Sequence, residues 1–312
     1  MKSATNYHVF GLNVLSEIEL PELIEGSLKD QPTIVVQMGQ VDAPPKDLAH
    51  TIYDSMRVYN DQFFFLNLKN IARFLAIQEN GHTKITIDLI DADSKPMMKS
   101  WFYGSVLTAA LQMNNRFALH ASAVLHQEKL VMFCGPSGIG KSTIASHLHT
   151  RGYPIFSDDK CVLNWKESSQ SFVVFPSLKI TRLWEDATEQ IDHSSFLHSP
   201  EQVTQRQSKY QFLLKDEMTI QESKPVGAIY RIQNVRTDAS LKVFSPTGIR
   251  RIRQLRNQTH RLNFVNGLGK KRIHWDYMER ITQKVPFHVM QRPQQTPIGD
   301  FVDFVEKTIA PK

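Results

Sequence analysis

The segment from Gly135 to Ser142 constrains the fold more than any other part of the chain. It reads Gly-Pro-Ser-Gly-Ile-Gly-Lys-Ser and matches the phosphate-binding pattern G-x-x-x-x-G-K-[ST] at every fixed position. A short apolar run, residues 129–134, precedes it, and residues 142–149 after it have helical character and stop before Gly152. A strand, a glycine-rich turn and a helix in this order aim backbone N–H groups and the positive helix end at one point. The pattern therefore predicts an α/β protein that binds a nucleoside triphosphate.

The motif also assigns roles to its members. Lys141 is expected to reach the outer phosphates, and the Ser142 hydroxyl is expected to ligate Mg²⁺. The predicted nucleotide-binding set is Gly135, Pro136, Ser137, Gly138, Ile139, Gly140, Lys141, Ser142 and Thr143. The alternative, a turn that merely connects a strand to a helix, is disfavoured by the specified residue types and by the flanking elements. The motif names no reaction, because switches and motors use it as well as enzymes.

Length and composition limit the kind of protein. The chain has 312 residues, enough for two domains, and its 41% hydrophobic and 22% charged residues are ordinary for a soluble globular protein. No stretch approaches the roughly 18 apolar residues of a membrane span. The N-terminus has no apolar region of the secretory type, so we expect a cytoplasmic protein without a membrane partner. Cys134 and Cys161 are too few for a disulfide framework and are expected to be buried free thiols.

Residues 6–90 read mostly as short strands. Their expected bounds are 7–15, 33–38, 56–59, 63–68, 72–77 and 84–89. Asn80-Gly81 is the dipeptide favoured in tight hairpins, and Asn60-Asp61 is a second turn signal. This pattern predicts an antiparallel β module, residues 1–95, with an architectural or substrate-holding role.

A second domain, residues 96–312, is expected to begin with a helix. Apolar residues at three- and four-residue spacing predict that helix over about 96–117. Beyond the nucleotide-binding motif we expect strands at 172–175, 225–232 and 287–290, helices from 183, at 271–281 and at 297–309, and a polar loop at 192–209 that closes over substrate.

Two adjacent carboxylates, Asp158 and Asp159, lie between apolar strand residues. Neighbours in a strand face opposite sides, so either one aspartate points at the metal and phosphates, or a bend at the strand end brings both to the site. Buried charges are costly unless they are paired or bind a metal, so the pair indicates a nearby cation. An exposed turn at the strand end is the alternative.

The whole chain has a net charge of +6, and its positive charge is concentrated in one segment. Between Gly248 and Arg272 there is no acidic residue, and the basic residues are Arg250, Arg251, Arg253, Arg256, Arg261, Lys270, Lys271 and Arg272. Such a segment can bind an acidic peptide, nucleotide phosphates or nucleic acid, or it can be a solvated helix face. Without interleaved aromatic residues or a DNA-reading motif, nucleic acid is the weakest of these partners.

His120, the motif with Lys141 and Ser142, and the Asp158-Asp159 pair together resemble the catalytic domain of bacterial HPr kinase/phosphorylase. The likeness covers about residues 115–180. The N-terminal Phe10-Gly-Leu and Glu19-Leu-Pro-Glu-Leu, and the segment from Pro176 to Ala187, look like the smaller HPr-kinase-like proteins of ribosomal-peptide gene clusters, among them the lasso-peptide tailoring kinases. The glutamate-led signature that follows the aspartate pair in true HPr kinases is missing, and Lys179, Thr181 and Arg182 stand there instead.

The resemblance implies a P-loop core related to phosphoenolpyruvate carboxykinase and an ATP- and Mg²⁺-dependent serine kinase. Its acceptor would be a peptide or protein, most closely a ribosomal precursor peptide. By resemblance, Asp158 is the catalytic base, Lys141 neutralises the transferring group, Asp159 supports the metal with Ser142, and His120 lies beside the catalytic aspartate. Adjacent aspartates can exchange roles, and His120 can instead be a core histidine satisfied by a backbone group.

Two other functions stay open at this point. One is a kinase of the same family that acts on an HPr-type protein or a small molecule. The other is a nucleotide-responsive binding protein without catalysis. The sequence does not identify the acceptor, and it is compatible with a homo-oligomer.

Overall fold

The computed structural model describes residues 4–310 except 28–30, 45–50, 54–55, 60–61, 185–200, 205–206 and 214–221. The chain forms two compact units: unit 1 comprises Met1–Ala118 and His260–Asp276, and unit 2 comprises Leu119–Thr259 and Tyr277–Lys312. The two predicted domains instead divide between residues 95 and 96, so residues 96–118 and 260–276 of the predicted second domain lie in unit 1. Sheets and helices occur together, which confirms the α/β class.

Unit 1 is built on a nine-stranded sheet with the strand order β3-β1-β2-β4-β9-β8-β7-β6-β5. The strands are β1 (Thr5–Val9), β2 (Leu12–Ser16), β3 (Ile24–Glu25), β4 (Ile34–Met38), β5 (Thr51–Tyr53), β6 (Met56–Tyr59), β7 (Phe63–Leu68), β8 (Ala72–Glu79) and β9 (His82–Leu89). The prediction of an antiparallel module was wrong in one respect, because β4 pairs in parallel with both β2 and β9. Alternating apolar residues do not distinguish the two pairings, since side chains alternate between faces in both.

Two hairpin turns of this sheet have positive φ at both of their central residues. Asn80 and Gly81 join β8 to β9 with φ of 50° and 84°, as the dipeptide predicts. Phe10 and Gly11 join β1 to β2 with φ of 54° and 77°. The run 7–15, expected to be one strand, is therefore two strands of a hairpin, because the positive φ values at its centre reverse the chain. The Asn60-Asp61 turn lies outside the described residues.

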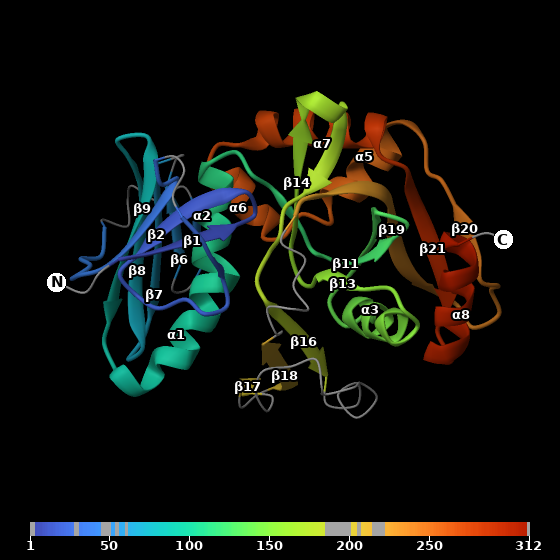
Figure 1. Cartoon of the computed structure of the whole chain (residues 1–312), viewed down its shortest axis with the longest axis horizontal. Helices are drawn as coiled ribbons and strands as arrows, with labels where there is room; N and C mark the ends of the chain where they lie inside the picture. The colour runs from blue at the N-terminus through green and yellow to red at the C-terminus, as the bar shows by residue number, and fades with distance from the viewer. Residues whose placement is uncertain are drawn as a thin grey trace. The chain divides into compact units, whose positions relative to one another are not determined.

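A nearly continuous helix follows the sheet, as predicted. It consists of α1 (Lys95–Trp101), a π-helical segment, η3 (Phe102–Val106), and α2 (Leu107–Met113). Figure 1 shows this helix alongside the strands of unit 1, and α2 contacts β8 and α6 (Leu262–Gly267). The helix is also bound to the buried carboxylate of Glu22. Glu22 accepts a hydrogen bond from the Tyr103 hydroxyl at 2.6 Å and forms an ion pair with Lys99 at 3.4 Å.

Unit 2 contains a second nine-stranded sheet and a separate three-stranded one. Its elements are β10 (Ala118–Leu119), β11 (Ala121–His126), β12 (Lys129–Cys134), α3 (Lys141–Thr150), β13 (Ile155–Ser157), β14 (Cys161–Lys166), β15 (Ser171–Val174), β16 (Ile180–Trp184), β17 (Glu201–Thr204), β18 (Gln207–Leu213), β19 (Lys224–Val235), β20 (Lys242–Phe244), α5 (Gly248–Arg256), β21 (Phe287–Pro293) and α8 (Ile298–Ile309). α7 (Lys271–Lys284) begins in the unit 1 part of the chain and ends in the unit 2 part.

Most expected elements of this region are present. The exceptions are the helix expected from 183, where β16 continues to Trp184, and the loop expected at 192–209, where β17 and part of β18 form strands. β18 pairs with β16, which lies about 25 residues earlier in the chain, and with its neighbour β17, and the polar composition of residues 192–209 gave no sign of either pairing. Residues 185–200 lie outside the described part, and among the described residues no helix has the length and apolarity of a membrane span.

The larger sheet of unit 2 brings several strand ends to one edge. β12 is parallel to β19, and β19 is parallel to β21. β11 is antiparallel to both β12 and β13, so β13 runs in the same direction as β12. The carboxyl ends of β12, β13, β19 and β21 therefore lie at the same edge as the start of β11. Figure 1 shows α3 in green and α8 in red beside these strands, and the two helices contact each other.

The core of unit 2 fixes α3 against the sheet. Ile144 and Leu148 of α3 are fully buried in a cluster with residues of β12, β19, β21 and α8. The helix ends as predicted at Gly152, which has φ of 92°. The N–H of Gly152 bonds to His149 O at 3.0 Å and that of Tyr153 bonds to Leu148 O at 3.1 Å, a Schellman motif.

Candidate functional site

The predicted nucleotide-binding loop leaves the carboxyl end of β12 and enters α3 at Lys141. Three of its glycines have positive φ: 148° at Gly135, 79° at Gly138 and 99° at Gly140. At Gly135 a Cβ atom would lie 2.9 Å from the carbonyl oxygen of Ile232 in β19, which is closer than real Cβ contacts. The backbone angles thus favour glycine at all three positions, and at Gly135 the close approach of β19 also leaves no room for a side chain.

The loop is anchored on one side and open on the other. The Ile139 side chain is 8% exposed and joins the core cluster of unit 2, and its N–H bonds to Pro136 O at 3.3 Å. Pro136, Ser137 and Gly138 are exposed. The loop is therefore anchored in the core through Ile139, and the three residues before Ile139 face solvent.

The side chain of Lys141 folds back onto the loop from which its helix begins. Its side chain is buried, with the residue only 6% exposed. The Nζ donates hydrogen bonds to the carbonyl oxygens of Gly135 at 3.0 Å and Pro136 at 3.1 Å. These acceptors are neutral, and a phosphate oxygen is a stronger partner for an ammonium group. The ammonium group is thus held at the loop by two carbonyl oxygens, and a phosphate oxygen can replace them as its acceptor.

Asp158 lies in a bend that follows β13, not within a strand, and it is 7% exposed. The sequence left a strand, a bend or an exposed turn open for this pair, and the structure has a bend, with Asp159 at φ of 73°. Asp158 Oδ1 accepts hydrogen bonds from Ser142 Oγ at 2.9 Å and from Ser122 Oγ at 2.6 Å. The carboxylate is therefore joined directly to the hydroxyl of the nucleotide-binding loop.

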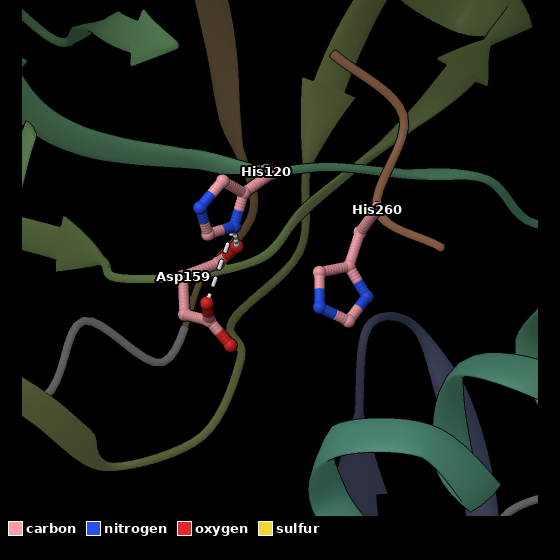
Figure 2. Close-up of side chains that lie close together, drawn as sticks. All are labelled: His120, Asp159 and His260. Carbon is pink, nitrogen blue, oxygen red and sulfur yellow. Dashed lines mark hydrogen bonds and ion pairs between the residues drawn. The ribbon is translucent and has the colours of Figure 1, made fainter. Parts of the chain in front are cut away.

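Asp159 has a different set of partners (Figure 2). His120 Nδ1 lies 3.3 Å from Asp159 Oδ1 and 3.2 Å from its backbone oxygen. Both neighbours are acceptors, so the tautomer with the proton on Nδ1 fits this contact. On the other side Lys160 Nζ lies 3.4 Å from Asp159 Oδ2, and Lys160 is only 1% exposed. His120 thus contacts both a backbone group and the carboxylate, and it is about 29% exposed, so it is not a core histidine.

The structure groups the predicted site residues around the end of β12. Lys141, Ser142 and Thr143 open α3, and Asp158 adjoins Ser142. His120 and Asp159 pair with each other beside this group. His260, also labelled in Figure 2, belongs to unit 1.

Sequence reasoning missed three residues of this edge. Ser122 binds Asp158, Lys160 binds Asp159, and Arg292 of β21 approaches the loop at Gly140. Lys160 had a signal, since a lysine directly after two aspartates in an apolar run has to be paired if it is buried. Ser122 and Arg292 had none, because only the pairing of strands brings them to the site.

The oxygen atoms at this site suit a hard cation. Ser142 Oγ and Asp158 Oδ1 are hydroxyl and carboxylate oxygens, the ligand types that Mg²⁺ takes together with phosphate oxygens and water. In P-loop nucleotide-binding proteins generally, a loop Ser or Thr and a carboxylate from a neighbouring strand hold the metal. The donor set therefore fits Mg²⁺ with a nucleotide phosphate.

Both cysteines are buried free thiols, as the sequence suggested. Burial raises the pKa of Cys134 to about 12 and that of Cys161 to about 12. We expect neither thiol of the folded protein to react with Ellman's reagent at pH 8, and both to react after unfolding in guanidinium chloride. Because the folded pKa values are raised, stability should fall as the pH rises above about 9, where unfolded thiols ionise. Rapid labelling of the folded chain would contradict the burial of these strands.

The basic segment of the sequence divides between the two units. Arg250, Arg251, Arg253 and Arg256 lie on α5 in unit 2, whereas Arg261, Lys270, Lys271 and Arg272 lie in unit 1. Arg250 and Arg253 are exposed. Arg251 donates from Nη2 to Val285 O at 2.8 Å, and burial lowers its pKa. Arg251 thus has a structural role, and the binding of an acidic or phosphate ligand by the exposed Arg250 and Arg253 stays a prediction.

Comparisons with known proteins add little to this geometry. No protein-family model matches the chain, and a search of curated proteins found no match. Among solved structures the chain is similar to the HPr(Ser) kinase/phosphatase from Coxiella burnetii. That similarity covers 62% of this chain and 87% of the other, with 10% sequence identity and a TM-score of 0.31. Membership of the HPr kinase family, and of its lasso-peptide branch, therefore stays a prediction from the sequence motifs.

Proposed function

We propose that the chain is an ATP- and Mg²⁺-dependent kinase that transfers the γ-phosphate to a serine hydroxyl of a peptide or protein. The observation that carries this proposal is the 2.9 Å hydrogen bond between Ser142 of the loop and the buried carboxylate of Asp158. A loop that merely connected a strand to a helix would not need a buried carboxylate at its hydroxyl, because that burial costs free energy.

In the proposed mechanism the loop and the start of α3 hold the phosphates. Backbone N–H groups from Ser137 to Ser142, other than that of Ile139, which bonds to Pro136 O, donate to phosphate oxygens. Lys141 exchanges its carbonyl partners for the outer phosphate. Its positive charge then offsets the charge on the transferring group.

Ser142 and Asp158 are proposed to hold the metal. Both oxygens lie at one point beside the loop, and Ser122 orients the carboxylate through its 2.6 Å hydrogen bond. Bound Mg²⁺ would supply charge neutralisation for the β- and γ-phosphates. This assignment exchanges the roles that the sequence resemblance implies for Asp158 and Asp159.

Asp159 is proposed as the base that accepts the proton of the attacking serine hydroxyl. Lys160 and His120 hold its carboxylate from two sides. Asp159 is about 24% exposed, so an acceptor hydroxyl can approach it. His120 acts here as a positioning residue, because its contact is with Asp159.

The acceptor class is proposed from the sequence resemblance alone. The experiment that tests it is phosphate transfer from labelled ATP and Mg²⁺ to a panel containing ribosomal-peptide precursors with serine near the C-terminus, an HPr-type protein and free serine. Mass spectrometry identifies the product. We expect a gain of one phosphate on a precursor peptide, lost in Asp159→Asn and kept in Asp238→Asn, a matched control whose side chain is 75% exposed.

Two other results of this transfer experiment would favour a different acceptor or a function without catalysis. A gain on the HPr-type protein or on free serine alone would replace the proposed acceptor. ATP binding without transfer to any member would favour a nucleotide-responsive binding protein.

A further inference from the structure

Arg292 approaches the nucleotide-binding loop from the side opposite the two aspartates. It lies near the end of β21, two strands away from β12, whereas β13 lies beyond β11 on the other side. An ideal Cβ on Gly140 would be 3.7 Å from Arg292 Nη1. The guanidinium group therefore borders the residue that caps the N-terminus of α3.

Only some of the hydrogen-bond donors of this guanidinium group have partners. Nη2 donates to Thr296 O at 2.8 Å, and Cζ lies 5.4 Å from the centre of the Phe301 ring. Nε is buried without a hydrogen-bond partner. Within the described part of the chain no carboxylate forms an ion pair with Arg292, and burial lowers its pKa.

The groups around Arg292 are also positive, so the lack of an acidic partner costs free energy. The N-terminus of a helix carries a partial positive charge, and the first turn of α3 also contains the Lys141 ammonium. Arg292 is partly buried, and a partly desolvated cation with no acidic partner beside a positive helix end is unfavourable, because nothing offsets its charge there. The arrangement becomes favourable when an anion occupies the loop.

We infer that Arg292 binds the phosphate chain of the nucleoside triphosphate through Nη1, on the flank of the loop opposite Asp158. The inference rests on the proposed nucleotide site and names a residue that the loop motif does not include. Thr296 and Phe301 hold the side chain in place before the ligand arrives, which reduces the entropy cost of the contact. An arginine fork suits phosphate oxygens geometrically.

Calorimetric titration with ATP and with inorganic tripolyphosphate, both with Mg²⁺, tests this contact. Tripolyphosphate has the phosphate chain but no sugar or base. We expect Arg292→Met to weaken both ligands by roughly 10- to 100-fold, the range of a lost charge-assisted hydrogen bond. Arg236→Met, at a side chain that is 89% exposed, should bind both like the wild type. Arg292→Lys, which keeps the charge without the fork, should weaken both by less, about 3- to 10-fold.

The remaining outcomes separate this inference from the proposed function. Weakening of ATP alone would mean a contact with the nucleoside and would overturn the inference. Unchanged binding of both ligands in Arg292→Met, with a wild-type unfolding temperature, would also overturn it while leaving the proposed function in place. If Arg292→Met does not fold, the Arg292→Lys titration decides in the same way. Failure of the wild type to bind either ligand would overturn both proposals.

Discussion

Replacing Lys141 by methionine is expected to weaken ATP binding by about 100-fold or more, because the substitution removes the only charge that the loop motif itself brings to the outer phosphates. Methionine fills a similar volume, so the core beneath the loop should stay intact. The carbonyl groups of Gly135 and Pro136 that now accept from Nζ border the exposed rim, where water can replace the lysine. Calorimetric titration with ATP and Mg²⁺ measures the effect.

Lys242→Met is the matched control for this experiment. Lys242 is exposed and lies in β20, so its loss removes a positive charge without touching the loop. The control should bind ATP as tightly as the wild type. Equal ATP affinity of Lys141→Met and the wild type would show that the nucleotide, if bound at all, binds elsewhere.

Replacing Asp159 by asparagine is expected to lower the rate of phosphate transfer by about 10²- to 10⁴-fold, the usual contribution of a general base. The affinity for ATP should change only a few-fold, because Ser142 and Asp158 remain. Asparagine keeps the shape and can still accept from His120, but it removes the ion pair between Asp159 and the buried ammonium of Lys160. The measurement is single-turnover transfer from labelled ATP, with thermal unfolding recorded alongside.

Asp238→Asn controls for the loss of one carboxylate at an exposed position. It should transfer phosphate at the wild-type rate. A wild-type rate in Asp159→Asn would exclude Asp159 as the base. If Asp158→Asn then abolished transfer while Mg²⁺-dependent ATP binding persisted, the roles implied by the sequence resemblance would be the right ones.

Local sequence signals predicted a large part of the fold. The hairpin at Asn80-Gly81, the end of α3 at Gly152 and the passage from β12 into α3 were all foreseen. Each of these features is decided by residues that are neighbours in the chain, through the backbone angles they allow. The positions of Lys141 and Ser142 at the start of α3 follow from the same kind of signal.

Features that depend on distant strands were not predicted. The parallel pairing of β4 with β2 and β9 leaves no trace in an alternating pattern. The hydrogen bond of Ser122 to Asp158 and the position of Arg292 near Gly140 arise because β11 and β21 lie in the same sheet as β12. The hydrogen bonds of Asp158 with Ser122 and Ser142 show which aspartate adjoins the loop, and the sequence alone left that choice open.

The central claim is that Ser142 and Asp158 together bind the metal of the nucleotide complex. The most direct test is the affinity for ATP measured by calorimetry with and without Mg²⁺ in the wild type, Ser142→Ala, Asp158→Asn and Asp159→Asn. The account predicts that Mg²⁺ raises affinity by about 10-fold or more in the wild type and Asp159→Asn, and that this gain disappears in Ser142→Ala and Asp158→Asn. A gain that persists in Asp158→Asn and is lost in Asp159→Asn would contradict the account.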